Sequence, residues 1–309
     1  MMIEAISILT FGLILLLVGA NLLVTSTESI KNHFSISGFF ASFFMIGIAT
    51  SAPEIFISIE SAIQNNTILA IGNGIGSNIS NIALVFCVSV LFINNDSHDL
   101  SIPKKPFLSM IFLTFALFLL IYIDGFFDLQ DSIILIITLL ISFYFFTATN
   151  NDNFIANQNK KSIFSTLSMS LIGLLMLVYG SDLFIDGATN IALLFGISTY
   201  VIGLTLTAIG TSLPELAANI QSARRGNLDF IVGNIIGSNI FNIAIAISVA
   251  GIISSTNVDI NDLSRDFLIL MLSIFVFYLI VKSNNTIIKT VYSVALVITY
   301  ILYVIFLLK

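Results

Sequence analysis

Residues 210–216 read GTSLPEL, which places Pro214 and Glu215 side by side between two strongly apolar runs. Proline lacks the backbone N–H of a helix interior and clashes with the carbonyl group four residues earlier. A carboxylate in the middle of a membrane helix costs about 2.5–3.5 kcal/mol on insertion scales. Both residues are unfavourable inside an apolar helix, so we expect the helix to contribute to a functional polar centre.

The same pattern occurs 161 residues earlier in the chain, with no gap needed from position 11 to 84. Between positions 50 and 84, 18 of 35 residues are identical to their partners. Shared apolar composition does not readily align Thr, Ser, Pro, Glu, Asn and Gly in order, so the chain contains an internal duplication. The matched stretches are TSAPEIFISIESA (50–62) with TSLPELAANIQSA (211–223), and GNGIGSNISNIA (72–83) with GNIIGSNIFNIA (233–244).

The composition excludes a soluble globular protein. Of the 309 residues, 57% are hydrophobic and 9% are charged, and the mean hydropathy is +1.07. Soluble domains carry about 25% charged residues, so the chain belongs to the polytopic helical membrane class. The single Cys87 excludes a disulfide framework. The N-terminus lacks a basic segment and a cleavage site, so we read it as a retained first span.

Ten apolar segments are long enough to cross a membrane, because a span needs about 20 apolar residues. The longest polar break, 149–162, is too short for a domain and is predicted to be a cytoplasmic linker between two halves. We therefore predict an all-α fold of two five-helix repeats, 1–148 and 163–309. The predicted spans are 3–24, 37–63, 68–93, 107–124, 131–149, 163–186, 198–223, 229–253, 266–282 and 287–308.

The basic residues orient these spans. If the N-terminus is outside, nine of the eleven Lys and Arg residues fall in cytoplasmic loops, and only Arg265 and Lys309 fall on the other side. This agrees with the positive-inside rule and places both termini outside. Because each repeat has an odd number of spans, the second must enter the membrane from the opposite side. Such inverted repeats are typical of secondary transporters.

The polar residues inside spans two, three, seven and eight form the candidate site. The two glutamates are expected to meet near the midplane, each on one helix face with the threonine four residues before it. The prolines should free the carbonyls of Ala49 and Gly210, and Asn73, Asn78, Asn234 and Asn239 should bond to neighbouring backbone. The remaining candidates supply oxygen: Thr50, Ser51, Glu54, Ser77 and Asn81, with Thr211, Ser212, Glu215, Ser238 and Asn242.

Oxygen-only ligation suits Ca²⁺, Na⁺ or Mg²⁺ and disfavours zinc or copper. Mg²⁺ gives up its waters reluctantly, so a cage built by the protein favours Ca²⁺. The two carboxylates balance one Ca²⁺, and the same oxygens, divided up, could hold several Na⁺. The sparse His and Cys residues leave no metal or nucleophile–base set for an intramembrane enzyme, so we expect a transporter without a cofactor.

These motifs resemble the two alpha-repeats of the sodium/calcium exchangers, in the prokaryotic branch of the cation/calcium exchanger superfamily. The core motifs would be residues 47–84 and 208–245. The resemblance implies four cation sites in a diamond, lined by the residues named above, with backbone carbonyls at Gly47 and Ala208 as possible additions. It also implies exchange of Ca²⁺ for Na⁺ by alternating access, with spans one and six sliding over the other eight.

The chain departs from some relatives at Asn242, where they carry an aspartate. Asn cannot ionise, so the site holds at most two negative charges, which argues against a potassium requirement. In the first motif, Ala49 and Ala52 replace the usual Gly and Leu, a change expected to alter packing more than ligation. The short linker also leaves no room for a cytosolic calcium-sensing domain.

Three readings of the function remain open from the sequence. The first is an electrogenic Na⁺/Ca²⁺ antiporter of a plasma membrane, expected to be a monomer that binds Ca²⁺, Na⁺ and lipid but no nucleic acid. The second is an H⁺/Ca²⁺ antiporter of the same superfamily. The third is a cation channel or a membrane scaffold, which the inverted repeat and the midplane acids disfavour.

Overall fold

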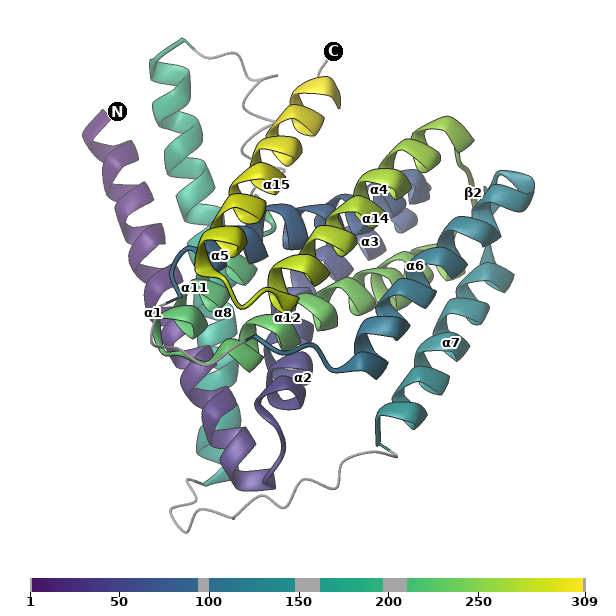
Figure 1. Cartoon of the computed structure of the whole chain (residues 1–309). Coiled ribbons are helices and arrows are strands. Elements are labelled where there is room, and N and C mark those ends of the chain that lie inside the picture. The colour runs from purple at the N-terminus through teal and green to yellow at the C-terminus, as the bar shows by residue number, and fades with distance from the viewer. Residues whose placement is uncertain (1, 94–99, 148–161, 197–209, 308–309) are drawn as a thin grey trace.

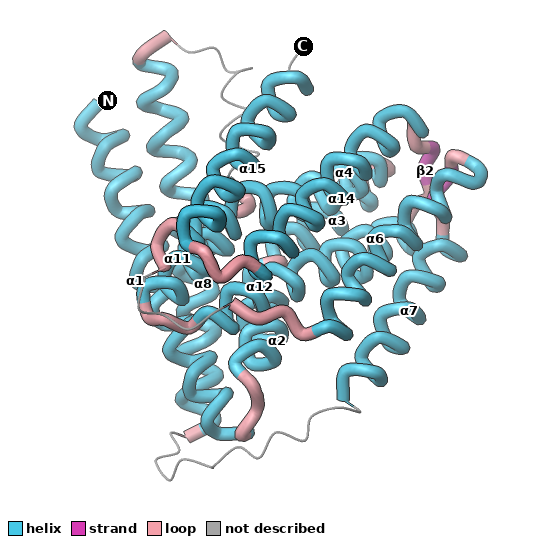
Figure 2. The backbone as a smooth tube through the Cα atoms, in the orientation of Figure 1, coloured by secondary structure: helices cyan, strands magenta, loops and turns pink. Residues whose placement is uncertain are grey.

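The computed structural model describes residues 2–93, 100–147, 162–196 and 210–307. Helices account for nearly all of this backbone, and the one exception with regular structure is a short antiparallel ribbon of β1 and β2 (Figures 1 and 2). The elements of the first part are α1 (Met2–Phe34), α2 (Gly38–Thr50), α3 (Ala52–Ile63), α4 (Thr67–Ser80), η1 (Asn81–Phe86), α5 (Cys87–Val90), α6 (Lys104–Asp124), β1 (Phe126–Phe127) and α7 (Leu129–Thr147).

Where the structure describes it, the second part repeats this order of helices, but β2 precedes α14 whereas β1 follows α6. It begins with another long helix and contains a second π-helical segment, written η3. Its elements are α8 (Ile163–Leu194), α11 (Leu213–Arg224), α12 (Leu228–Phe241), η3 (Asn242–Ile247), α13 (Ser248–Ile253), β2 (Thr256–Asn257), α14 (Ile260–Lys282) and α15 (Thr286–Leu307).

Within the described residues, eight helices are long and apolar enough to cross a membrane, or nine if α2 and α3 form one bent span. The predicted seventh span begins at 198, and residues 197–209 lie outside the described part of the chain. α1 and α8 continue well beyond the predicted ends at 24 and 186. The start of α1 and the end of α15 lie at the same end of the bundle (Figure 1).

The two ends of the bundle differ in charge. We call the end where α1 finishes and α6 begins the basic end, because it carries Lys31, Lys104, Lys105, Arg224, Arg225 and Lys282. The opposite end, where α6 finishes and α14 begins, carries Asp124, Asp128, Asp259 and Asp262 and is called the acidic end.

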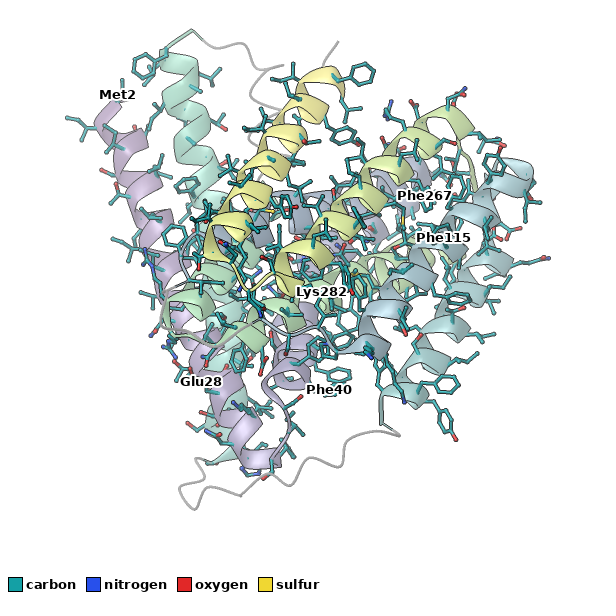
Figure 3. All side chains as sticks on the ribbon, viewed as in Figure 1. Met2, Glu28, Phe40, Phe115, Phe267 and Lys282 are labelled. Atoms are coloured by element: carbon teal, nitrogen blue, oxygen red, sulfur yellow. The ribbon has the colours of Figure 1, made fainter. Side chains whose placement is uncertain are left out.

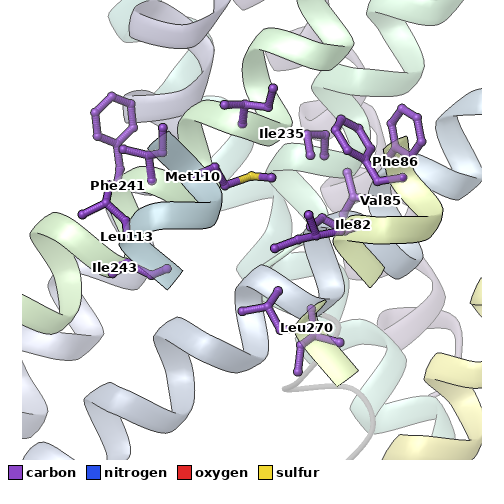
Figure 4. Close-up of a cluster of buried hydrophobic side chains, with 14 of the residues drawn as sticks. Ile82, Val85, Phe86, Met110, Leu113, Ile235, Phe241, Ile243 and Leu270 are labelled. Atoms are coloured by element: carbon purple, nitrogen blue, oxygen red, sulfur yellow. The ribbon is translucent and has the colours of Figure 1, made fainter. Parts of the chain in front are cut away.

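Two helices form the centre of the bundle. In the most apolar stretch of Leu228–Ile253, 83% of the residues are buried, and in that of Thr67–Val90, 67% are buried. The other six candidate spans bury only 17% to 33%. Side chains from α6 and α14 pack on this centre, including Met110 and Leu270 (Figure 4). The outer helices thus present most of their surface to lipid. The two central helices carry the repeated motifs 72–83 and 233–244, and the glutamate motifs lie beside them at the starts of α3 and α11.

The predicted second span is two helices rather than one. α2 ends at Thr50, α3 begins at Ala52, and their axes differ by 42°. Pro53 lies in the first turn of α3, where its missing N–H costs nothing. Thr50 and Glu54 therefore lie on two successive helices rather than on one continuous helix, with the bend at Ser51 between them.

Each central helix contains one π-helical turn, a feature that the sequence did not predict. The two segments, Asn81–Phe86 and Asn242–Ile247, lie 161 residues apart and each begins at a candidate asparagine. Single π-helical turns occur often at functional sites. η1 packs against α11, and η3 packs against α3, so each wide turn lies beside the helix that carries the other repeat's glutamate.

α1 and α8 pack chiefly against each other (Figure 1). A Cβ atom on Gly12 would lie 2.5 Å from the Phe184 backbone nitrogen, and one on Gly19 would lie 2.8 Å from the Gly173 carbonyl oxygen. No larger residue fits at these positions without moving the backbones apart. The two helices therefore form a closely joined pair, the α1–α8 pair, on one side of the bundle.

Candidate functional site

The two glutamates lie in matching positions at the start of half-length helices. Glu54 is in the first turn of α3, and Glu215 is in the first turn of α11; both are fully buried. The side chain of Glu215 is close enough to Glu54 and to the Thr50 hydroxyl for electrostatic interaction with both. The two motifs, 161 residues apart, therefore meet in space as predicted.

The carboxylate oxygens of both glutamates are without partners. Among the residues that the structure describes, no contact to either oxygen of Glu54 or of Glu215 has the geometry of a hydrogen bond, and no basic side chain pairs with them. The Ser51 hydroxyl and the amide oxygens of Asn81 and Asn242 are also unpaired and buried. Buried ionised groups are very costly unless a counter-charge or a metal compensates them. This donor set therefore fits a hard cation.

Thr50 and Ser238 approach each other through an amide that the sequence analysis did not include as a site residue. The Thr50 hydroxyl oxygen lies 3.3 Å from Asn234 Oδ1, and the Ser238 hydroxyl oxygen lies 3.2 Å from the same atom. Ser238 also lies 3.4 Å from the Gly47 carbonyl oxygen. Asn234 Nδ2 donates to Asn219 Oδ1 at 3.0 Å, which fixes its oxygen towards the hydroxyls. Asn234 is therefore a positioning residue.

Ser212 is the counterpart of Ser51 in the second repeat, but the two hydroxyl groups have different surroundings. Ser212 is buried, and its hydroxyl bonds to that of Ser80 at 3.0 Å. Ser80 was missed because its partner in the duplication is Phe241, so the repeat gave no signal for it. Thr211 is only half-buried, whereas Thr50 is fully buried. Ala208 lies outside the described residues.

The central asparagines join the two halves. Asn78 Nδ2 donates to the Asn239 carbonyl at 3.0 Å, and Asn242 Nδ2 donates to Asn78 Oδ1 at 3.1 Å. Asn73 also bonds to backbone, at the Glu54 carbonyl. Backbone bonding was expected for Asn73, Asn78, Asn234 and Asn239, and only Asn234 differs. Ser77 is buried one turn before Asn81 on the same helix.

The freed carbonyl expected at Gly210 is not open. Ser181 of α8 donates its hydroxyl to this carbonyl at 2.7 Å. The expectation that the Pro214 break leaves an unsatisfied oxygen at Gly210 was wrong, because a neighbouring helix supplies the missing donor. In the first repeat, the Ser51 N–H lies near the carbonyls of both Gly47 and Ala49. The α1–α8 pair thus touches the helix break directly.

The fold and the buried oxygens define the class: a polytopic membrane protein with an ionisable polar centre at the starts of two half-length helices, α3 and α11. The sequence profile described as sodium/calcium exchanger protein matches residues 4–148 and 165–309. An uncharacterized membrane protein of Methanocaldococcus jannaschii is 38% identical over 255 residues, which cover 82% of this chain and 83% of that protein.

Two further relatives have informative names. The sodium/calcium exchanger MaX1 of Methanosarcina acetivorans is 29% identical and covers 79% of this chain and 82% of its own length. A solved structure of the sodium-calcium exchanger NCX_Mj, soaked with Na⁺ and Sr²⁺, superimposes with a TM-score of 0.81 at 31% identity, covering 98% of both chains. The chain belongs to the sodium/calcium exchanger family.

Proposed function

We propose that the protein is a secondary antiporter that exchanges Ca²⁺ for Na⁺ by alternating access. The observation that carries this proposal is the meeting of Glu54 and Glu215, both fully buried and without a hydrogen-bonded or basic partner among the described residues. A carboxylate pair in this setting needs cations to be stable. The names of MaX1 and NCX_Mj support sodium and calcium as the ions.

The charge of the site matches this exchange. The two carboxylates carry two negative charges, which neutralise one Ca²⁺. They also neutralise two Na⁺ ions when several Na⁺ ions share the surrounding oxygens. Asn242 donates to Asn78 and carries no charge, so it adds an oxygen without a third negative charge. The proposed ligands are Thr50, Ser51, Glu54, Ser77, Asn81, Thr211, Ser212, Glu215, Ser238 and Asn242, with the carbonyls of Gly47 and Ala208.

We propose ten transmembrane helices in two inverted five-helix repeats, 1–148 and 163–309, joined by the linker 149–162. The 161-residue duplication, the two separately matched halves and the repeated breaks and π-helical turns support this division. The start of α1 and the end of α15 lie at one end of the bundle (Figure 1), as an even number of crossings requires. By the positive-inside rule, the basic end faces the cytoplasm of a plasma membrane and both termini are outside.

The α1–α8 pair is the proposed moving element. Its two helices pack chiefly on each other, and the apolar stretches of α1 and α8 are only 28% and 22% buried. Ser181 and Ile185 of α8 lie directly against Gly210 at the helix break. Displacement of the pair would therefore uncover the polar centre to one end of the bundle at a time.

Coupling can be tested in proteoliposomes with separate Na⁺, K⁺ and H⁺ gradients. We expect an imposed Na⁺ gradient alone to drive Ca²⁺ uptake. Exchange of three Na⁺ for one Ca²⁺, as in the family, moves one net charge, to which the membrane potential contributes about 2.3 kcal/mol per 100 mV. Uptake should therefore respond to a potassium–valinomycin potential. Uptake driven by H⁺ and not by Na⁺ would support an H⁺/Ca²⁺ antiporter instead, and uncoupled flux would support a channel.

The site itself can be tested by removing one charge at a time. Glu54→Gln or Glu215→Gln should reduce Ca²⁺ uptake to the level of protein-free liposomes, because the amide keeps the shape but removes the charge that balances Ca²⁺. Glu60→Gln, which changes an exposed acid at the end of the same helix as Glu54, is the matched control. Exchange at the unmodified rate in either site variant would contradict the assignment.

A further inference from the structure

A second cavity lies between the start of α6 and the end of α14, and shares no residue with the polar centre. It has a volume of about 490 Å³. Its walls are mainly apolar and include Phe107, Leu108 and Tyr278. Two lysines, Lys104 and Lys282, also line it. Lys104 is the first residue of α6 and Lys282 is the last residue of α14, so the cavity lies at the basic end, where these two helices would leave the membrane.

Among the described residues, no acidic group competes with an anion for these two lysines. Each is exposed, and within the described residues no carboxylate forms an ion pair with either. The Lys282 ammonium lies 5.6 Å from the centre of the Tyr278 ring, which holds it at the cavity by a cation–π contact. The adjacent Lys105 is engaged elsewhere, since it donates to the Phe145 carbonyl at 3.0 Å.

The apolar wall is partly open to the bilayer. Leu108 is 61% exposed, and Phe107 stacks on Tyr278 with 5.7 Å between ring centres. Towards the acidic end, the seam between α6 and α14 is closed by Phe267, which lies 5.1 Å from Phe115 and 4.1 Å from Phe118 between ring centres (Figure 3). The cavity is therefore limited to the basic end of this seam.

We propose that this cavity binds an anionic phospholipid. The phosphate group would lie between the ammonium groups of Lys104 and Lys282, and an acyl chain would follow Phe107 and Leu108 into the bilayer. A small inorganic anion would not contact the apolar wall. A zwitterionic lipid has no net negative charge to attract the two lysines, whereas an anionic phospholipid has. Basic pockets between membrane helices on the cytoplasmic side are suited to anionic head groups. The proposal rests on the proposed orientation only for the choice of leaflet.

The chain contains no tryptophan, so a single introduced tryptophan reports on one place. We suggest Leu108→Trp in the cavity wall and, as its matched control, Phe112→Trp, which changes an exposed residue one turn further along α6 and outside the cavity. Both full-length variants would be placed in phosphatidylcholine vesicles with a minor fraction of brominated lipid. Brominated phosphatidylglycerol should quench Leu108→Trp more strongly than brominated phosphatidylcholine, and Phe112→Trp should show no preference.

The lysines are tested in the Leu108→Trp chain. Lys104→Gln with Lys282→Gln should weaken the preference for phosphatidylglycerol about 30-fold, as expected for the loss of two charges near a membrane surface. Lys289→Gln, which removes a lysine on the first turn of α15, should leave it intact. Equal quenching by both lipids, survival of the preference in the double variant, or its loss on adding inorganic phosphate would each overturn the proposal. None of these fluorescence measurements requires Ca²⁺ exchange, so their outcome is independent of the proposed transport function.

Discussion

The α1–α8 pair meets the rest of the bundle in two different ways at its two ends. At the basic end, α1 is held to the end of α11 by a polar network centred on Arg225. The Arg225 guanidinium donates to Glu28 at 3.1 Å, to Thr25 at 2.8 Å and to Asn21. Gln221 donates to Asn21 at 2.9 Å and Asn227 donates to Glu28 at 2.7 Å. Glu28 lies near the lower end of α1 in Figure 3.

The residues that correspond by the 161-residue shift form no such network at the acidic end. The positions of Asn21 and Thr25 are taken by Asp182 and Asp186 of α8, and those of Gln221 and Arg225 by Glu60 and Gln64. Both aspartates are exposed. Among the described residues, Gln64 reaches only Glu60, at 3.4 Å, and no arginine or lysine pairs with the acids.

The difference shows that the duplicated backbone carries unequal chemistry at its ends. The basic end is closed by the Arg225 guanidinium, which bridges α1 and α11. The acidic end has aspartates and glutamates that repel one another and attract cations. We expect the protein to rest with the basic end closed and the acidic end accessible. Three substitutions test this comparison, from the largest expected effect to the smallest.

The first substitution introduces an arginine at the acidic end, at position 64, which corresponds to Arg225 in the duplication. In Gln64→Arg, the new guanidinium would face Asp182 and Asp186 whenever that end closes. Hydrogen bonds to charged groups contribute about 1.5–3 kcal/mol each, so Na⁺-driven Ca²⁺ uptake should fall about 10- to 100-fold. Adding Asp182→Asn and Asp186→Asn should restore uptake to the level of that double variant alone, and Gln64→Ala should have little effect. An unchanged rate in Gln64→Arg would contradict the comparison.

The second substitution removes the network at the basic end. In Arg225→Gln the ion pair with Glu28 is lost; its side chains are 26% and 35% exposed, so it is worth at most about 1 kcal/mol. We expect hydrogen exchange at the end of α1 to speed up about fivefold, measured by mass spectrometry. Arg224→Gln is the matched control, because Arg224 lies over the Phe92 ring at 5.3 Å rather than on α1. Equal effects of the two variants would show that Arg225 does not hold α1.

The third substitution weakens the acids alone. Asp182→Asn with Asp186→Asn should lower Ca²⁺ uptake a few-fold at limiting Ca²⁺, because fewer charges attract the ion. The loss should shrink as ionic strength rises, since exposed charges are screened over about 10 Å at 0.1 M salt. Asp124→Asn, at the same end but on α6, should change little. A loss that does not depend on salt would indicate a structural role instead.

The sequence predicted the features that repeat. Composition alone established a helical membrane protein, and the duplication predicted that Glu54 lies beside Glu215. These predictions succeed because a buried acid is costly and needs a partner or an ion, and because a repeated motif in both halves directs attention to both copies. The matching wide turns at Asn81 and Asn242 escaped prediction, since the apolar residues after them fit an α-helix equally well.

The features that differ between halves could not be predicted from the sequence. Ser80 bonds to Ser212 although its repeat partner is Phe241, and Ser181 reaches the Gly210 carbonyl from another helix. Such contacts depend on which side chains the packing brings within hydrogen-bond distance, and spacing along the chain does not encode this. Pro53 indicated a disturbance of the second span, but the sequence did not predict that the helix ends at Thr50 or how far the two helix axes diverge.

α1 and α8 have 33 and 32 residues, so each is about 50 Å long at 1.5 Å per residue. The hydrocarbon layer of a typical bilayer is about 30 Å thick. Helices that long must tilt or project beyond the layer, and any displacement of the pair changes how much apolar surface leaves the lipid. If the pair moves as proposed, the thickness of the membrane becomes one of the quantities that set the balance between the two open states of the proposed antiporter, and lipids of different chain length should shift it.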